Sequence, residues 1–168
     1  MNNNNNNNER IAFLDFEASG LNHLSWPIEV GWACVDGSSS SYLIRPHHSW
    51  SADAWDPAAE GLHGISVKQL LRDGVPIPDV CDVLDNALSG LRVFVDALSW
   101  DEFWLFRLYE AAGRKASFQL YDFAQLIRTI IGNDQSSLCT VKKDTARHRA
   151  EADAKNLREI YLAVKHSG

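Results

Sequence analysis

The order of the short apolar runs constrains the fold of this chain more than any other feature of its sequence. Three runs rich in aromatic or branched residues, at 10–16, 28–35 and 40–44, follow one another closely, with turn-forming segments at 20–27 and 36–39 between them. This series predicts an antiparallel meander. Strand-like runs at 92–95 and 117–120 then alternate with helical patterns. The whole order predicts an α/β fold with a mixed sheet covered by helices.

Apolar spacing and capping signals locate the helices. We expect helices at 66–72, around 80–88, from a Ser99 cap to about 112, at 122–131 and at 149–165. Gly113 is placed to end the third of these. Residues 46–64 have no clean period and contain Pro57 and Gly61, so they predict a loop with at most a helical turn, and 132–137 predict another loop.

Composition indicates one globular domain. Residues 1–8 are a methionine followed by seven asparagines, a low-complexity tract, native or an added tag, that cannot bury apolar surface. The remaining residues, 9–168, suffice for a single core. No apolar run reaches the roughly 18 residues of a membrane span, and no secretion signal is evident, so the cytoplasm is the expected compartment. Cys34, Cys81 and Cys139 are widely spaced among apolar neighbours, which predicts small buried hydrophobes rather than disulfides or a zinc site.

The formal charge of −6 argues against broad binding of a phosphate backbone. Proteins that bind in this way use clustered Lys and Arg to displace counterions. If the substrate is a nucleic acid, the attraction must be local.

Acidic residues stand where apolar ones are expected on the first strand. Because side chains alternate along a strand, Asp15 and Glu17 share a face with Ile11 and Phe13, while Phe16 faces the opposite side and belongs to the core. The alternative is a solvated strand end, which explains such a pair equally well in isolation.

Two helices repeat this anomaly. Asp101 lies on the same stripe as Trp104 and Leu108, although an acid in the first turn of a helix also complements the helix dipole. Asp153 lies on the apolar face of the final helix, with Leu157. We therefore expect four inward carboxylates.

Four gathered carboxylates need positive charge nearby. An unpaired buried carboxylate costs several kcal/mol, and the inward faces offer no matching basic residues. Two Mg²⁺ or Mn²⁺ ions would match the four charges, and oxygen ligands suit these metals. His148 precedes Asp153 by five residues, which places it at the helix start or on the preceding loop; taken alone, it is an ordinary surface residue.

The motifs together resemble a known family over nearly the whole chain. They are FLDFEASGL at 13–21, IEVG at 28–31, LHGIS at 62–66, SWD at 99–101 and HRAEADA at 148–154. The chain resembles the DEDDh exonucleases, the ribonuclease T-like group of the ribonuclease H-like superfamily, which includes polymerase proofreading subunits and oligoribonucleases. The histidine before the last acid matches the "h" subgroup. The chain departs from the family at 96–97, where Asp-Ala replaces a common His-Asn pair and adds negative charge.

The resemblance implies a ribonuclease H-like sheet, with three antiparallel strands followed by parallel strands, and hydrolysis of single-stranded DNA or RNA from the 3′ end to nucleoside 5′-monophosphates. It implies that Asp15, Glu17, Asp101 and Asp153 hold two divalent cations. It also implies that His148 is the general base and that Glu17 belongs to the catalytic set.

The resemblance further implies that the backbone at Glu17 and Ala18 meets the 3′-hydroxyl and that Leu21 packs on the terminal base. Stacking by Trp50, Trp55 or His63 competes with simple packing, and none of them is assigned.

Two other functions remain open: a catalytically inactive module that binds nucleic-acid ends or a protein, and a two-metal endonuclease. No motif distinguishes DNA from RNA. A homodimer is a weak expectation from the family.

Overall fold

A five-stranded mixed sheet forms the centre of the structure, a computed structural model that describes residues 10–132 and 148–167. The strands are β1 (Ile11–Ala18), β2 (Pro27–Cys34), β3 (Ser39–Leu43), β4 (Arg92–Val95) and β5 (Leu120–Asp122). Their order is β3-β2-β1-β4-β5. The first three strands pair antiparallel, whereas β4 pairs parallel with both β1 and β5. The predicted mixed sheet is confirmed. The tract at 1–8, Cys139 and all but the first residue of the loop predicted at 132–137 lie outside the described residues.

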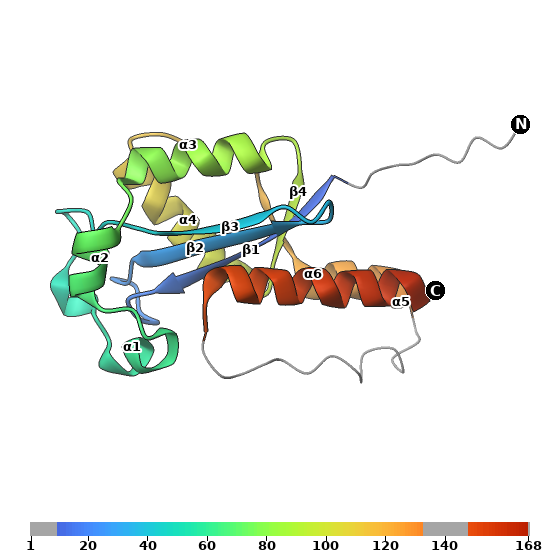
Figure 1. Ribbon diagram of the computed structural model, residues 1–168, viewed down its shortest axis with the longest axis horizontal. Coiled ribbons are helices and arrows are strands. Elements are labelled where there is room, and N and C mark those ends of the chain that lie inside the picture. The colour runs from blue at the N-terminus through green and yellow to red at the C-terminus, as the bar shows by residue number, and fades with distance from the viewer. Residues whose placement is uncertain (1–9, 133–147, 168) are drawn as a thin grey trace, which may run out of the picture.

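Helices cover both faces of this sheet. They are η1 (Ala52–Ala54), α1 (Pro57–His63), α2 (Val67–Asp73), α3 (Ile77–Leu88), α4 (Leu98–Ala111), α5 (Phe123–Ile131) and α6 (Ala150–Ser167). In Figure 1, α3 and α4 lie on one face, α5 and α6 lie on the other, and α1 and α2 lie at the end of the sheet where β1 finishes. Within the described part of the chain, no helix combines the length and apolar character needed to cross a membrane.

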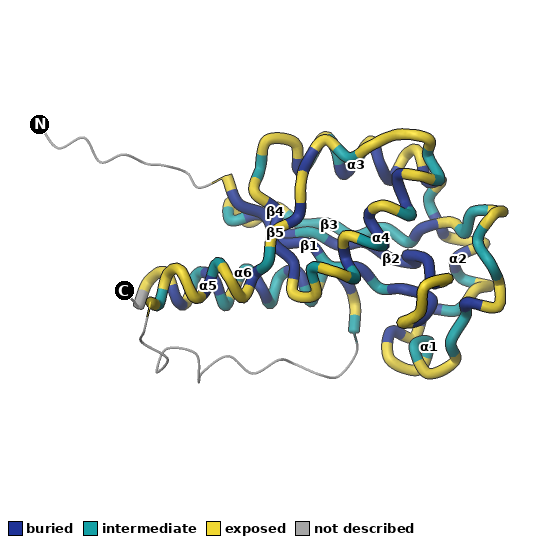
Figure 2. The backbone as a smooth tube through the Cα atoms, turned by 180° about the vertical axis from the view of Figure 1, so that it is seen from behind, coloured by how far each residue is buried: buried dark blue, intermediate teal, exposed yellow. Residues whose placement is uncertain are grey.

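The alternation along β1 divides the core into two layers. Ala12, Leu14 and Phe16 pack in the cluster that includes α3 and α4, whereas Ile11 and Phe13 pack in the cluster that includes α5 and α6. Phe16 is 4% exposed, so its predicted place in the core is confirmed. Figure 2 shows the buried strands between helices whose outer sides are exposed. Asp15 and Glu17 therefore face α6.

The prediction of a loop over 46–64 was wrong for 57–63, which form α1. The signals of this helix are local: Asp56 caps its start by accepting a hydrogen bond from Ala58 N–H, Pro57 occupies the first turn, and Gly64 ends it at φ +69°. The helix spans only 7 residues, too few to establish an apolar period.

Two further boundaries differ from the predictions. The helix α4 begins after Ala97, and its Asp101 carboxylate accepts a hydrogen bond from the Ala97 N–H at 3.3 Å, so Ser99 is not the cap. Strand β5 begins at Leu120 rather than at 117, because Asp85 of α3 binds the backbone N–H and hydroxyl of Ser117 at 2.9 and 2.8 Å.

Other expectations are confirmed. Gly113 follows α4 with φ +68°, as predicted for the residue that ends this helix. Cys34 and Cys81 are buried free thiols, as predicted for small hydrophobes.

Candidate active site

The end of β1 supplies the first half of the site. Register places Asp15 opposite Gly31 of β2 and Glu17 opposite Glu29, and the ladder shifts between Glu17 and Ala18. Directly opposed residues share a face, so all four face α6. Two carboxylates therefore end an otherwise apolar strand beneath a helix.

The absence of a side chain at Gly31 allows the first turn of α6 to lie directly on β2. A Cβ atom at this position would lie 2.2 Å from the backbone nitrogen of Glu151 and 2.3 Å from the carbonyl carbon of Ala150. The start of α6 thus meets the sheet beside the acids of β1. Asp153, in the first turn of α6, is brought to the same place.

Three of the predicted residues come together as a possible metal-binding group. One ligand atom each of Glu17, His148 and Asp153 lies within 4.8 Å of the others. The Nδ1 atom of His148 lies 3.5 Å from Oδ2 of Asp153, and the imidazole side chain is 41% exposed. His148 directly precedes Arg149 and the start of α6, where the sequence predicted it.

These residues line what we call the acidic pocket, a cavity of about 110 Å³. Its lining also includes Asp15 from β1, Asp96 directly after β4, and Asn156 from α6. The carboxylate and imidazole donors of the pocket are groups that can bind a divalent cation. Asp96, noted in the sequence only as a departure from the family, thus adds a carboxylate to the pocket.

Glu17 is a strongly perturbed acid of the pocket. Burial, together with the charges of Asp153 and Glu29, raises the pKa of its carboxyl from 4.5 to about 8, whereas Arg149 opposes the rise. A nearby cation would reverse this shift by stabilising the ionised form. The electrostatics of the pocket therefore favour a bound positive charge.

Asp101 lies behind the acidic pocket rather than in its lining. Its side chain is almost fully buried at 2% exposure. Burial raises its pKa to about 7, against the effect of backbone hydrogen bonds from Ala97 and Phe16. Its charge still reaches Glu17, so it belongs to the same electrostatic group.

A second cavity, which we call the apolar cavity, adjoins the acidic pocket and has a volume of about 320 Å³. The two share Phe16, Glu17 and His148. Both predicted substrate-binding residues, Ala18 and Leu21, line the apolar cavity. Leu21 is 70% exposed, as expected of a side chain at a cavity rim. A larger groove beside α4 shares no lining residue with either cavity.

The aromatic residues left unassigned by the sequence divide into two groups. Trp50 and Trp55 pack against Trp26, with ring centroids 5.5 and 5.7 Å apart, and line neither of the two cavities. His63 does line the apolar cavity, and its buried Nδ1 accepts a hydrogen bond from the Ile65 N–H at 3.0 Å. Burial lowers the pKa of His63.

No matching basic residue was expected on the inward faces, and the structure places one arginine, Arg149, within electrostatic range of Glu17. Arg149 forms an ion pair with Glu29, in which Nη2 lies 2.6 Å from Oε1 and Nε lies 3.0 Å from Oε2. The sequence pattern missed this pair because the partners are 120 positions apart. The charge of Arg149 is balanced by Glu29. It is therefore not a full countercharge for the acids of the pocket.

The fold is shared with solved exonuclease structures. One exonuclease I structure superposes with a TM-score of 0.75 at 13% identity over 93% of this chain. The Escherichia coli exonuclease I–single-stranded DNA complex in its zinc-bound form gives 0.72 at 12% over 94%, and a moderately thermophilic exonuclease I from Methylocaldum szegediense gives 0.69 at 13% over 93%.

The chain spans 40% of each of these three exonuclease I chains. No protein-family model matches the sequence. No curated protein matches it in sequence either. The similarity therefore establishes the ribonuclease H-like exonuclease fold, as the sequence motifs predicted.

Proposed function

We propose that residues 9–168 form one metal-dependent 3′-to-5′ exonuclease domain that releases nucleoside 5′-monophosphates from single-stranded DNA or RNA. The observation that carries this proposal is the convergence of Glu17, His148 and Asp153, within 4.8 Å of one another, at the junction of the acidic pocket and the apolar cavity. The solved neighbours are exonucleases, and one of them is described with single-stranded DNA and zinc, which supports the choice of reaction.

The acids would hold the cations. We assign Asp15, Glu17 and Asp153 as ligands of two Mg²⁺ or Mn²⁺ ions, with Asp101 as a further ligand, directly or through water. Bound cations would acidify a water molecule and offset the charge of the phosphate. The raised pKa of Glu17 supports this assignment, since a carboxyl that resists ionisation alone is stabilised as a carboxylate beside a cation.

His148 is positioned to receive a proton. Its ring lies at the edge of the acidic pocket, partly exposed, with Nδ1 at 3.5 Å from Asp153. A carboxylate beside an imidazole stabilises the protonated ring, which is the product of general-base catalysis. We therefore assign His148 as the base that deprotonates the attacking water.

The apolar cavity would select the chain end. Its walls combine apolar side chains with the backbone around Ala18, and it opens into the acidic pocket beside Glu17. A terminal base packed against Leu21 would place the adjacent phosphate at the acids. This arrangement explains why cleavage would begin at an end and release single nucleotides.

A nucleotide-release assay tests the proposal. Single-stranded oligonucleotides labelled at the 3′ or the 5′ end are incubated with Mg²⁺ and the wild-type protein, His148→Ala or Asp153→Asn. We expect labelled mononucleotide to appear first from the 3′ label, and each variant to lose roughly 100- to 10,000-fold in rate, as for removal of an acid-base group. His166→Ala and Glu159→Gln, exposed positions on the same helix, are the matched controls.

Each rival function predicts a different result. An inactive binding module would bind the oligonucleotide without any product, and equal product from the wild type and the variants would refute the assigned mechanism. Cleavage of circular single strands would favour an endonuclease. The same assay on matched DNA, RNA and dinucleotides identifies the preferred substrate.

A further inference from the structure

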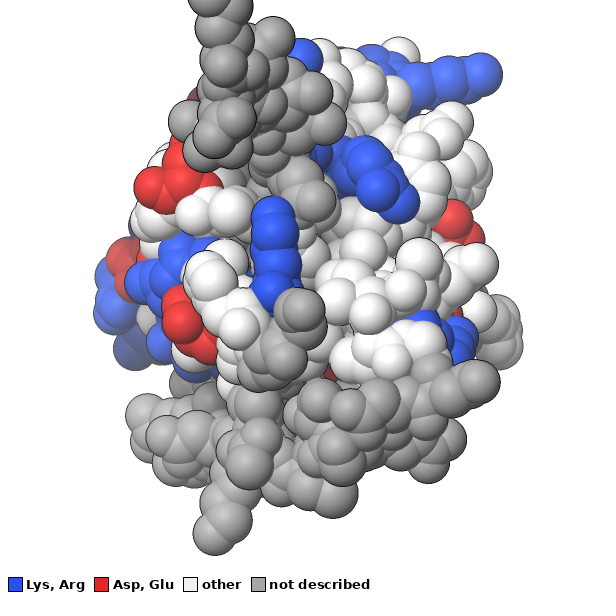
Figure 3. All heavy atoms as spheres, turned by 90° about the vertical axis from the view of Figure 1, so that its right-hand side faces the viewer, with Lys and Arg blue, Asp and Glu red and all other residues white. Residues whose placement is uncertain are grey.

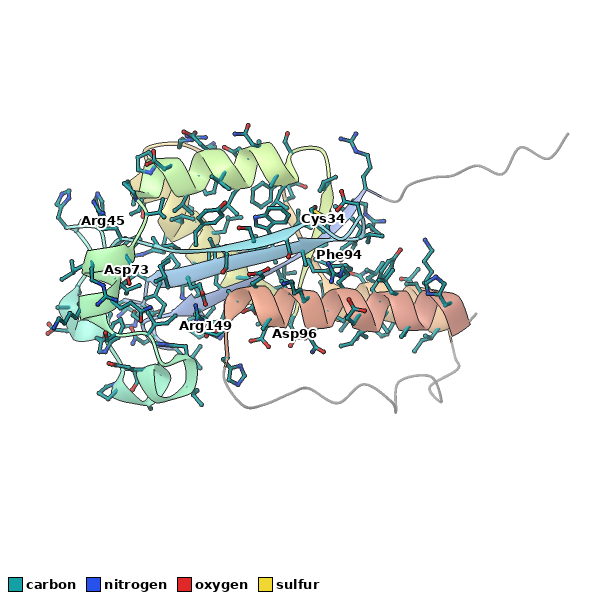
Figure 4. All side chains as sticks on the ribbon, viewed as in Figure 1. Cys34, Arg45, Asp73, Phe94, Asp96 and Arg149 are labelled. Carbon is teal, nitrogen blue, oxygen red and sulfur yellow. The ribbon has the colours of Figure 1, made fainter. Side chains whose placement is uncertain are left out.

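Arg149 carries a positive charge to the edge of the acidic pocket. It lies between His148 and the first residue of α6, and Figure 4 shows it at the start of this helix, beside the sheet. Its side chain is 45% exposed. The charges of Arg149 and Glu17 influence each other's pKa, so the guanidinium lies within electrostatic range of the acids.

Glu29 binds one edge of this guanidinium, through Nε and Nη2. Nε and Nη2 of Arg149 donate to its carboxylate at 2.6, 3.0 and 3.2 Å, and the backbone N–H of Ala150 donates to Oε2 at 3.1 Å. Glu29 is 1% exposed, and it lies opposite Glu17 across the β1–β2 ladder. The contact thus joins β2 to the start of α6, one strand away from the metal-binding acids.

We propose that Glu29 is a positioning residue that holds Arg149 away from Glu17 and Asp153, and so keeps these acids open to a cation. The inference rests on the proposed function, because it assumes that the acids bind a divalent metal.

Competition between the arginine and a metal follows from the chemistry of the guanidinium. A guanidinium pairs bidentately with carboxylates and stays charged, so a free arginine beside several acids is an internal substitute for a divalent ion. Glu29 is buried, and Arg149 balances its charge. Pairing with Glu29 therefore keeps the arginine away from the other acids at little further electrostatic cost. Without Glu29, the nearest carboxylates within range of Arg149 include Glu17.

Calorimetric titration with Mn²⁺ tests this arrangement without any substrate. We expect Glu29→Gln to weaken Mn²⁺ binding by roughly 10- to 100-fold, as is usual when a partner of a metal ligand is removed. The double variant Glu29→Gln/Arg149→Gln should return to near wild-type affinity, because the competing guanidinium is gone. Glu151→Gln, which removes the ion pair with Lys155 on the same turn of α6 but keeps an acceptor for Ser39, is the control and should bind normally.

Two further measurements separate competition from misfolding and from a simple change of net charge. Glu29→Asp retains the charge but shortens the side chain, and it should weaken Mn²⁺ binding several-fold while melting as one cooperative transition. A crystal structure of metal-free Glu29→Gln should show the Arg149 guanidinium paired with Glu17 or Asp153.

Four outcomes would contradict the inference or its premise. Unchanged Mn²⁺ affinity in both Glu29→Gln and Glu29→Asp overturns it. A crystal structure of Glu29→Gln in which the Arg149 guanidinium points to solvent also overturns it. A double variant as weak as Glu29→Gln also overturns it, because Arg149 would not be the competitor. If the wild-type protein binds no Mn²⁺, the result would instead contradict the proposed metal site, and with it the proposed function.

Discussion

Glu17 links the stability of the protein to pH. Its carboxyl is held beside Asp153 and Glu29 by the β1–β2 register and the first turn of α6, and its pKa is raised from 4.5 to about 8. The folded state without metal therefore binds a proton at Glu17 more tightly than the unfolded chain does. Asp101, raised to about 7 by burial, acts in the same direction.

The first prediction concerns the pH dependence of stability without metal. The stabilising effect of the proton on Glu17 is complete below the unfolded pKa of 4.5 and is lost as the pH rises through about 8. In EDTA, the melting temperature should fall across this window, and Glu17→Gln should reduce the slope. Added Mg²⁺ should raise the melting temperature more at the alkaline end. A melting temperature that rises steadily over the same window would contradict the assignment of pKa values.

The second prediction concerns Leu21 at the rim of the apolar cavity. Because Leu21 is 70% exposed and lines the apolar cavity proposed to take the terminal base, Leu21→Ala should raise KM about tenfold, from lost apolar contact, and leave kcat and the melting temperature nearly unchanged. Leu71→Ala on α2 is the matched control, since Leu71 is 62% exposed and lines neither cavity. Steady-state kinetics on a short single strand provide the measurement. An equal change in KM from Leu21→Ala and Leu71→Ala would contradict the proposed role of Leu21.

At the scale of elements, the close approach of α6 to β2 sets the geometry of the site. The third prediction follows from Gly31, which touches no cavity and yet determines where α6 begins. Gly31→Ala forces a Cβ against the backbone of Ala150 and Glu151, and it should cost at least about 1–3 kcal/mol of unfolding free energy, with weaker Mn²⁺ binding.

The control for this prediction is Gly61→Ala on the exposed side of α1. A Cβ at Gly61 meets no atom within 4 Å, and alanine is the better helix former, so a gain of about 0.5–1 kcal/mol is expected. Urea denaturation of both variants measures the difference. If Gly31→Ala proved as mild as Gly61→Ala, α6 would not depend on this contact for its position.

The elements also show what the sequence can and cannot predict. The bounds of β4 were predicted correctly because a short apolar run between two helical patterns is most simply explained as a strand. The acids of β1 and α6 were placed on the right faces by periodicity alone. The candidate site was predicted from the sequence motifs as well as from the spacing of the acids.

The start of α4 was misjudged because Ser99 does not cap the helix; instead the Asp101 carboxylate accepts a hydrogen bond from the N–H of Ala97, which precedes the helix. Contacts between distant parts of the chain were harder still to predict. The pairing of Glu29 with Arg149 escaped prediction because it depends on β2 and α6 meeting, which no local pattern encodes. The adjoining apolar cavity likewise exists only once β1, α1 and α4 have packed together.

At the scale of the whole molecule, charge limits how a nucleic acid can be held. The chain carries a formal charge of −6, and on the face seen in Figure 3, Lys and Arg lie scattered among uncharged and acidic side chains. That view shows the end of the molecule opposite α1 and α2. Under the proposed function, the negative net charge predicts that binding depends on one or two terminal nucleotides rather than on a long basic track.

The fourth prediction is a shallow dependence of binding on salt. With about two phosphate contacts, affinity for a single strand should fall less than about tenfold between 50 and 200 mM salt, whereas a protein with six or more contacts loses about a thousandfold. Fluorescence anisotropy with Asp153→Asn, which should bind without cleaving, measures this slope. A steep slope would instead indicate that an extended basic surface binds the strand.

The distance along the chain between the two halves of the site has a consequence for biosynthesis. Glu29 and Arg149 are 120 positions apart, and at ordinary translation rates of about 5–20 residues per second the second half emerges roughly 6–24 seconds after the first. Until α6 leaves the ribosome and docks on Gly31, Glu17 lacks His148 and Asp153, the other two members of the candidate metal-binding group. Under the proposed function, a nascent chain therefore gains activity only once α6 has docked on the sheet.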